Sequence, residues 1–117
     1  MKIYTYAKCS TCRNALKWLD ERSISYQNVP IRETPPSNAE LKRMLNAQEG
    51  NIRKLLNTSS QDYRDLGIKD QLDSMKPEAV FELMQTNGNL VKRPFVISKE
   101  IHLTGLKAEE WGKAFGQ

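Results

Sequence analysis

The chain has 117 residues, of which 38% are hydrophobic and 27% charged, and its formal net charge at pH 7 is +4. This length suits one domain with its own hydrophobic core, and no apolar run approaches the roughly 20 residues of a membrane-spanning helix. The basic residues are scattered rather than gathered in a stripe with aromatic side chains, which argues against nucleic acid as a direct partner. We therefore expect a cytoplasmic protein whose partners include neither nucleic acid nor a membrane.

The first 30 residues follow the order strand, helix, strand. Residues 2–6 contain alternating β-branched and aromatic side chains and are predicted to form a strand. From residue 10 onward, apolar side chains recur at the spacing of a helix; they are Cys12, Ala15, Leu16 and Leu19. Residues 24–29 are predicted to form a second strand that ends at Pro30. This order predicts a right-handed βαβ unit with parallel strands.

The middle of the chain, from about residue 37 to residue 87, has helical patterns and no strand pattern. The segment Ser37–Glu40 has the form of a capping box at the start of a helix. Shorter helices are expected near residues 52–56 and 61–66, and Pro77 suits the first position of another helix. We expect this stretch to be a helical insertion.

The last part returns to strands. Residues 95–97 and 101–104, separated by a polar turn, are predicted to form a hairpin, and residues 107–115 a closing helix. The order βαβ, helices, ββα predicts an α/β fold in which helices cover a small mixed sheet. We expect residues 1–117 to form a single domain.

Cys9 and Cys12 are the two cysteines of the chain, and they lie where the first predicted strand meets the first helix. A Cys-x-x-Cys pair beside a βαβ pattern is typical of thioredoxin-like redox proteins. A thiol at a helix N-terminus faces free backbone N–H groups and the positive end of the helix dipole, and Arg13 adds a positive charge. Because these features favour the thiolate, we predict Cys9 as the nucleophile and Cys12 as the resolving thiol.

Two other interpretations of the cysteine pair stay open at this point. A structural zinc site needs four ligands, and the chain offers one further soft ligand, His102. Alternatively, both thiols fill the core without reacting. That interpretation suits Cys12 better than Cys9, which Lys8 and Ser10 flank in a polar loop.

Arg93 and Pro94 form a second candidate site, directly before the predicted strand at residues 95–97. Proline is tolerated at the first position of a strand. In thioredoxin-like folds, a cis-proline precedes this strand and lies across from the Cys-x-x-Cys pair, where its backbone hydrogen-bonds a substrate chain. The sequence does not fix the isomer. The Arg93 guanidinium is suited to bind a carboxylate or an oxyanion there.

The segment CSTCRNAL, from Cys9 to Leu16, resembles the active-site stretch of the arsenate reductase (ArsC)/Spx family. Residues 92–97 resemble the Arg-Pro strand of that family, and residues 55–67 resemble its helical insert. The three landmarks occur in order and span essentially the whole chain. The resemblance implies a cytoplasmic, thioredoxin-like domain with a redox-active cysteine pair and a helical insertion.

Functions diverge within this family. Its glutaredoxin-linked arsenate reductases attack arsenate with the cysteine that corresponds to Cys9 and hold the oxyanion with several arginines. Arg13 and Arg93 fit that pattern, whereas Asn57 stands where another arginine is expected, and Gly105-Leu106 lies near the place of one more. The Spx branch uses a similar cysteine pair as a redox switch and acts by binding RNA polymerase.

We therefore expect a thiol–disulfide oxidoreductase of the ArsC-like group whose site comprises Cys9, Cys12, Arg13, Arg93 and Pro94. We expect no bound cofactor or metal, and an external thiol donor such as glutathione, glutaredoxin or thioredoxin. Its partner would be a thiol or disulfide protein, or a small oxyanion. A Spx-like regulator that binds RNA polymerase is the first alternative. An arsenate reductase is the second, and we expect arsenate turnover to be slow or absent.

Overall fold

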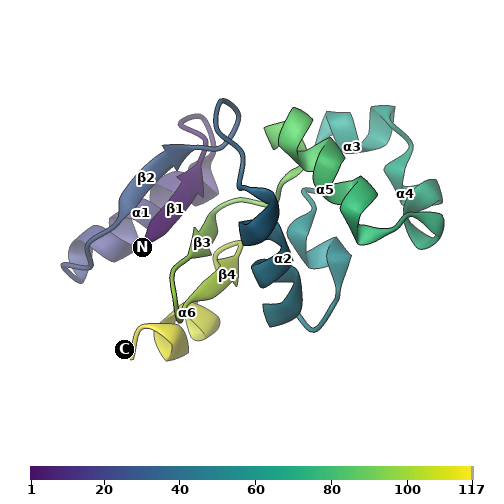
Figure 1. Ribbon diagram of the computed structural model, residues 1–117. Coiled ribbons are helices and arrows are strands. Elements are labelled where there is room, and N and C mark those ends of the chain that lie inside the picture. The colour runs from purple at the N-terminus through teal and green to yellow at the C-terminus, as the bar shows by residue number, and fades with distance from the viewer. Residues whose placement is uncertain (117) are drawn as a thin grey trace.

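The centre of the fold is a sheet with the strand order β2-β1-β3-β4 (Figure 1), seen in a computed structural model that describes residues 1–116. The strands are β1 (Lys2–Thr5), β2 (Gln27–Pro30), β3 (Phe95–Ile97) and β4 (His102–Thr104). β1 pairs in parallel with β2 and antiparallel with β3, and β3 pairs antiparallel with β4. The predicted βαβ unit and the predicted hairpin are both confirmed.

Helices cover both faces of this sheet. They are α1 (Ser10–Glu21), α2 (Asn38–Ala47), α3 (Gln61–Asp65), α4 (Ile68–Gln71), α5 (Pro77–Thr86) and α6 (Ala108–Ala114), with 3-10 turns η1 (Ile52–Leu55), η2 (Leu72–Ser74) and η3 (Gly88–Leu90). Figure 1 shows α2 next to the sheet, with α3, α4 and α5 gathered farther out on that side. The elements between β2 and β3 are all helical, so the predicted insertion is confirmed.

Two hydrophobic cores flank the sheet because successive side chains of a strand point to opposite faces. Ile3 and Val96 face α1 and α6, where they pack with the fully buried Trp111. The neighbouring Tyr4 and Phe95 face the other way and join the core formed with the helical insertion. The sheet therefore carries α1, and with it the cysteine pair, on one face and the insertion on the other.

The start of the insertion is fixed by a capping box, as predicted. The Glu40 backbone N–H donates to Ser37 Oγ at 3.2 Å, and the Ser37 N–H donates back to Glu40 Oε1 at 3.0 Å. The same carboxylate accepts a hydrogen bond from Tyr4 Oη at 2.6 Å and pairs with Lys2 Nζ at 3.3 Å. Glu40 thus ties the first turn of α2 to β1.

The second strand differs from its predicted bounds. β2 begins at Gln27 rather than at residue 24, because Ile24 packs into the core under α1 and α6 instead of pairing with β1. The strand also includes Pro30, which lies opposite Thr5. β2 is at the edge of the sheet, where a proline without an N–H donor is tolerated. No helix in the described part of the chain is long and apolar enough to cross a membrane.

Candidate active site

Cys9 is the N-cap residue of α1, as predicted from its place between strand and helix. Its Sγ accepts a hydrogen bond from the Cys12 backbone N–H at 3.3 Å. The sulfur thus takes the position of the side-chain oxygen that usually satisfies a free N–H at the start of a helix. Both cysteines are free thiols; Cys9 is half-buried, whereas Cys12 is only 1% exposed.

The two thiols have opposite pKa shifts. Burial raises the pKa of Cys9, but hydrogen bonds from the Cys12 thiol and backbone N–H, together with the charge of Arg93, outweigh burial, so the pKa is lowered. Burial raises the pKa of Cys12 to about 12; a hydrogen bond from the Tyr6 backbone opposes this, and the neighbouring Cys9 reinforces it. Because the thiolate is the reactive form, these shifts favour ionisation of Cys9 over that of Cys12.

Arg93 lies beside Cys9, and its peptide bond to Pro94 is cis. The guanidinium carbon of Arg93 stands 4.9 Å from the centroid of the Tyr6 ring, a distance suited to a cation–π contact. One guanidinium nitrogen, Nη1, is buried and has no hydrogen-bond partner among residues 1–116. Since a buried donor without a partner is costly, this nitrogen is suited to bind a ligand atom.

Arg13, which the sequence predicts to favour the Cys9 thiolate, hydrogen-bonds the backbone of the preceding loop. Its Nη1 donates a hydrogen bond to the Ala7 carbonyl oxygen at 2.9 Å, across the loop that precedes α1. The positive charge that lowers the pKa of Cys9 belongs to Arg93. The reason is geometric, because Arg13 lines a pocket on the Cys12 side of the helix rather than the pocket beside Cys9.

A polar pocket of about 490 Å³ opens beside Cys9. Cys9, Thr11 and Arg93 line one side of it. The helical insertion and η3 supply the remaining lining, which consists of amide and hydroxyl side chains and one carboxylate: Asn57, Ser59, Ser60, Gln61, Asp62 and Asn89. Of these residues, the sequence analysis identified only Asn57, which stands where the family resemblance leads us to expect an arginine.

Asp62 is the carboxylate in this pocket. Its Oδ2 accepts hydrogen bonds from Asn87 Nδ2 at 2.8 Å and Asn89 Nδ2 at 3.1 Å. These two hydrogen bonds, with a further contribution from the charge of Arg32, hold the pKa of Asp62 below its usual range, so it is ionised at neutral pH. Sequence reasoning missed Asp62, since an acid in the first turn of a helix is common there for its effect on helix stability alone.

Tyr6 is a second residue that sequence reasoning missed. Its ring contacts two guanidinium groups, because the Arg32 carbon also lies 4.9 Å from the ring centroid and Arg32 Nη1 donates to Tyr6 Oη at 2.9 Å. Tyr6 therefore packs its ring against the Arg93 guanidinium. The sequence offered no signal beyond an aromatic residue at the end of a strand.

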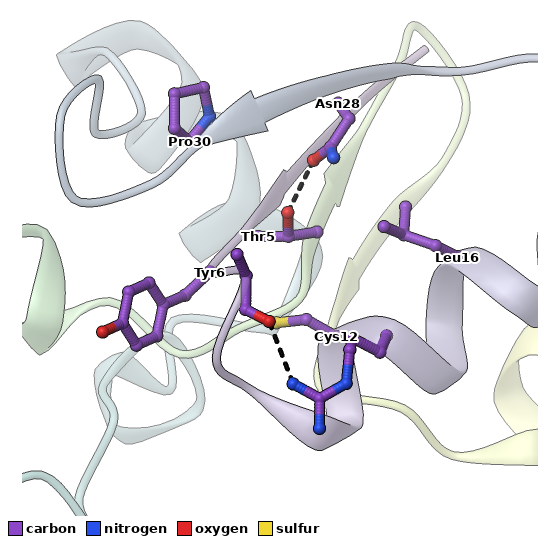
Figure 2. A pocket seen from close by; sticks show the side chains of 8 residues that line it. Thr5, Tyr6, Cys12, Leu16, Asn28 and Pro30 are labelled. Atoms are coloured by element: carbon purple, nitrogen blue, oxygen red, sulfur yellow. Dashed lines mark hydrogen bonds between the residues drawn. The ribbon is translucent and has the colours of Figure 1, made fainter.

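A second pocket, of about 350 Å³, adjoins the start of α1 on the side of Cys12 (Figure 2). Figure 2 shows Cys12 and Leu16 extending from α1 beneath the pair of strands, where Thr5 Oγ1 donates to Asn28 Oδ1 at 2.5 Å. The two cysteines thus line different pockets. Across residues 1–116, the cysteines join no group of three or more side chains that could hold a metal ion.

The parallel β1–β2 pair, the β3–β4 hairpin, the cysteine pair at the start of α1 and the cis-proline before β3 define a thioredoxin-like protein. The chain belongs to the ArsC family, whose model it matches over residues 4–114. Both the fold and the family predicted from the sequence are confirmed.

Relatives of known sequence or structure span most of the chain. The uncharacterised protein YusI of Bacillus subtilis (strain 168) is 36% identical over 111 residues, which cover 95% of this chain and 94% of YusI. The global transcriptional regulator Spx of Listeria innocua is 32% identical over 108 residues, covering 92% of this chain and 81% of Spx. A crystal structure of an ArsC family related protein from Bacteroides fragilis superimposes with a TM-score of 0.89 at 39% identity, covering 97% of this chain and 95% of that one.

Proposed function

We propose that the protein is a cytoplasmic thiol–disulfide oxidoreductase in which Cys9 attacks and Cys12 resolves. The main support is the contrast between the two thiols, since the pKa of Cys9 is lowered while that of Cys12 is raised to about 12. A low pKa supplies the attacking thiolate, and the protonated Cys12 stays in reserve one helical turn away. Reduced thiols of this kind suit the cytoplasm.

The reaction has two exchange steps. The Cys9 thiolate attacks one sulfur of a substrate disulfide, so a Cys9–substrate disulfide forms, the substrate S–S bond breaks, and the released thiolate takes a proton from solvent. Cys12 then loses its proton to solvent and attacks Cys9 Sγ, which forms the Cys9–Cys12 disulfide and releases the second substrate thiol. The protein dithiol is oxidised by two electrons, and the substrate is reduced by two.

An external thiol donor closes the cycle by reducing the Cys9–Cys12 disulfide; glutathione, glutaredoxin and thioredoxin are the candidates. We assign to Arg93 the role of holding the Cys9 thiolate, and to the Pro94 backbone that of positioning the substrate chain. The guanidinium beside the sulfur supports the role of Arg93. Arg13, bound to the Ala7 carbonyl oxygen, would stabilise the loop that carries Cys9.

Trapping of the intermediate tests this function. The Cys12→Ser variant, mixed with 2-hydroxyethyl disulfide, should accumulate a mixed disulfide at Cys9 that intact-mass spectrometry detects, whereas Cys9→Ser should form none at Cys12. The unmodified protein should instead close a Cys9–Cys12 disulfide that dithiothreitol reverses. Faster alkylation of Cys12 than of Cys9 at about pH 6 would show that the roles are assigned wrongly.

A Spx-like regulator is the second candidate, favoured by the 32% identity to the transcriptional regulator Spx of Listeria innocua. In this case the Cys9–Cys12 pair senses oxidation, and its disulfide changes the affinity for RNA polymerase. Pull-down of purified RNA polymerase by the oxidised and reduced protein distinguishes the two candidates. Redox-dependent capture without turnover of any disulfide would favour the regulator.

Arsenate reduction is the third candidate, suggested by the family. Arg93 is the single arginine that lines the pocket beside Cys9, and Leu106 packs against the core with Trp111. We therefore expect arsenate turnover to be slow or absent, and we expect Asn57→Arg to raise it by adding a second cation to the pocket. Robust arsenate reduction by the unmodified protein, abolished by Arg93→Ala, would move this candidate to first place.

A further inference from the structure

We propose that Asp62 makes the pocket beside Cys9 selective for disulfides that carry an ammonium or guanidinium group close to the sulfur, and unfavourable to anionic disulfides. This inference rests on the proposed function, because it names the substrate class for the same site. The first observation is that Asp62 and Cys9 line one pocket although they are far apart in the sequence.

The balance of charges in the pocket favours a cationic ligand. Arg93 and Asp62 are the two side chains among the residues that line it that are charged at neutral pH. The Arg93 guanidinium already interacts with the Cys9 sulfur, so the thiolate offsets its charge when Cys9 is ready to attack. The carboxylate of Asp62 is then the remaining charge, and it sets the sign of the field that an approaching disulfide meets.

The charge of Arg32, which lies outside the pocket lining, acts on Asp62. Its guanidinium lies against the Tyr6 ring and is hydrogen-bonded to Tyr6 Oη. Arg32 is exposed to solvent, so its charge is well screened. It forms no ion pair with Asp62 within the described residues, which leaves the carboxylate available to a ligand.

The orientation of Asp62 is fixed by η3 and its N-cap residue, Asn87. Asn87 and Asn89 both donate to Oδ2 of the carboxylate, and Asn87 Oδ1 in turn accepts the Asn89 backbone N–H at 3.0 Å. Between them lies Gly88, where a Cβ atom would come within 2.1 Å of the Ile31 carbonyl oxygen. Only glycine allows the backbone to pack this closely, so the two amides are held in place by the chain that follows β2.

Because the Asn87 and Asn89 amides both bind Oδ2 of Asp62, the other carboxylate oxygen, Oδ1, is available to a ligand. Across residues 1–116, the side-chain hydrogen bonds to Asp62 all reach Oδ2. Oδ1 is therefore suited to accept from the ammonium or guanidinium of a substrate whose sulfur faces Cys9. A charge-assisted hydrogen bond of this kind is stronger than one between neutral groups.

Three small disulfides of similar size test the selectivity: cystamine, which carries ammonium groups, the neutral 2-hydroxyethyl disulfide, and the anionic 3,3′-dithiodipropionate. The rate of mixed-disulfide formation at Cys9 is measured for each in the Cys12→Ser background by quenching and intact-mass spectrometry. Each rate is divided by that of a small free thiol with the same disulfide. This division removes the intrinsic reactivity of the reagents.

The corrected rates should fall in the order cystamine, neutral disulfide, dithiodipropionate. Asp62→Asn, which keeps the shape of the side chain, should lower the ratio of cystamine to dithiodipropionate by roughly tenfold, as expected for one charge in a water-accessible pocket. Raising the salt to about 0.5 M should bring the ratio of the cystamine rate to the dithiodipropionate rate closer to one in the parent, and should change it little in Asp62→Asn. Asp62→Glu should restore much of the ratio.

Asp70→Asn is the control, since Asp70 is an exposed acid of α4 that does not line the pocket; its ratio should equal that of the parent. A merely structural role of Asp62 would slow all three disulfides by the same factor and leave the ratio unchanged, which would overturn the inference. An anionic preference in the parent would overturn it as well. If even the neutral disulfide fails to react at Cys9, the proposed function falls too, whereas normal reaction with no charge ranking refutes the inference alone.

Discussion

The two pockets at the start of α1 hold thiols only three residues apart, yet they offer them opposite surroundings. The pocket beside Cys9 is lined by amides, hydroxyls, a guanidinium and a carboxylate, whereas the pocket beside Cys12 is lined by β1, β2, the loop before α1 and residues of α1 that include Arg13 and Leu16. In the first, hydrogen bonds and a nearby charge outweigh burial. In the second, burial outweighs them.

This difference follows from helix geometry. The N-cap residue lies at the very end of the helix, next to free backbone N–H groups, while the residue three positions later has turned toward the sheet. Cys9 therefore meets the helical insertion, and Cys12 meets the core. The opposite pKa shifts of the two thiols depend on this placement more than on the residues that flank them in the sequence.

The largest effect should come from removing either thiol. Cys9→Ser should abolish disulfide reduction, a loss of roughly 10³-fold or more, because a serine hydroxyl cannot act as the thiolate nucleophile. Cys12→Ser should still attack and then stop at the mixed disulfide. Steady-state reduction of 2-hydroxyethyl disulfide, followed together with intact-mass spectrometry, measures both results. Equal retention of turnover in the two variants would show that the pockets do not separate the roles.

The pH dependence of alkylation should separate the thiols next most strongly. A thiol with a pKa of about 12 is ionised to only about one part in 10⁵ at neutral pH, whereas a thiol with a pKa below its usual value is ionised to at least a few per cent. Iodoacetamide should therefore modify Cys9 roughly 10³-fold faster than Cys12 near neutral pH. Peptide mapping after timed quenching measures the two rates.

The same shift predicts a change in stability. Because the pKa of Cys12 is raised in the folded state, its contribution to stability is complete below the pKa of the unfolded thiol, about 8.5, and is lost as the pH rises toward 12. The free energy of unfolding in urea should thus fall between about pH 8.5 and the highest pH that the protein tolerates. Cys12→Ser should lose less over this range. An identical alkaline loss in both proteins would contradict the assignment.

The sequence predicted those structural features that depend on residues close together in the chain. The strand–helix junction, the N-cap position of Cys9 and the capping box at Ser37 all follow from short patterns, and the structure has each of them. The Arg-Pro step before β3 was also found as a candidate. Its cis peptide bond is visible only in the structure.

The rest of the site depends on packing between distant segments. Arg13 is close to Cys9 in sequence, but Arg93 provides the charge, because β3 lies beside β1 in the sheet. Asp62 reaches the pocket through the insertion and is aligned by Asn87 and Asn89, some 25 residues later. No local pattern distinguishes such a carboxylate from an ordinary acid in the first turn of a helix.

Replacing each of the two arginines by alanine in turn should give effects of intermediate size on Cys9 alkylation. Arg93→Ala should raise the pKa of Cys9 and slow its alkylation near neutral pH by roughly tenfold, since one partly exposed charge and its hydrogen bond are lost. Arg13→Ala should change the rate by less than about twofold, because its guanidinium is bound to the Ala7 carbonyl oxygen. The pH profile of Cys9 alkylation measures both. A larger effect of Arg13→Ala would restore the role that the sequence suggested.

The smallest effect concerns the pocket on the Cys12 side. Thr5 is 5% exposed, and its hydroxyl hydrogen-bonds the Asn28 side chain across the β1–β2 pair. Thr5→Val keeps the β-branched shape but removes this hydrogen bond, so it should lower the free energy of unfolding by about 1 kcal/mol. Thr58→Val, at an exposed position, is the control and should lie within about 0.5 kcal/mol of the parent.

Urea unfolding and Cys9 alkylation should be measured on the same preparations. If the two pockets are independent, Thr5→Val destabilises the fold and leaves the pH profile of Cys9 unchanged, because its hydroxyl faces β2 and takes no part in the polar pocket. If the profile shifts together with the stability, the strand pair transmits its packing to the N-cap of α1. The thiols would then be coupled through β1 as well as through their shared helix turn.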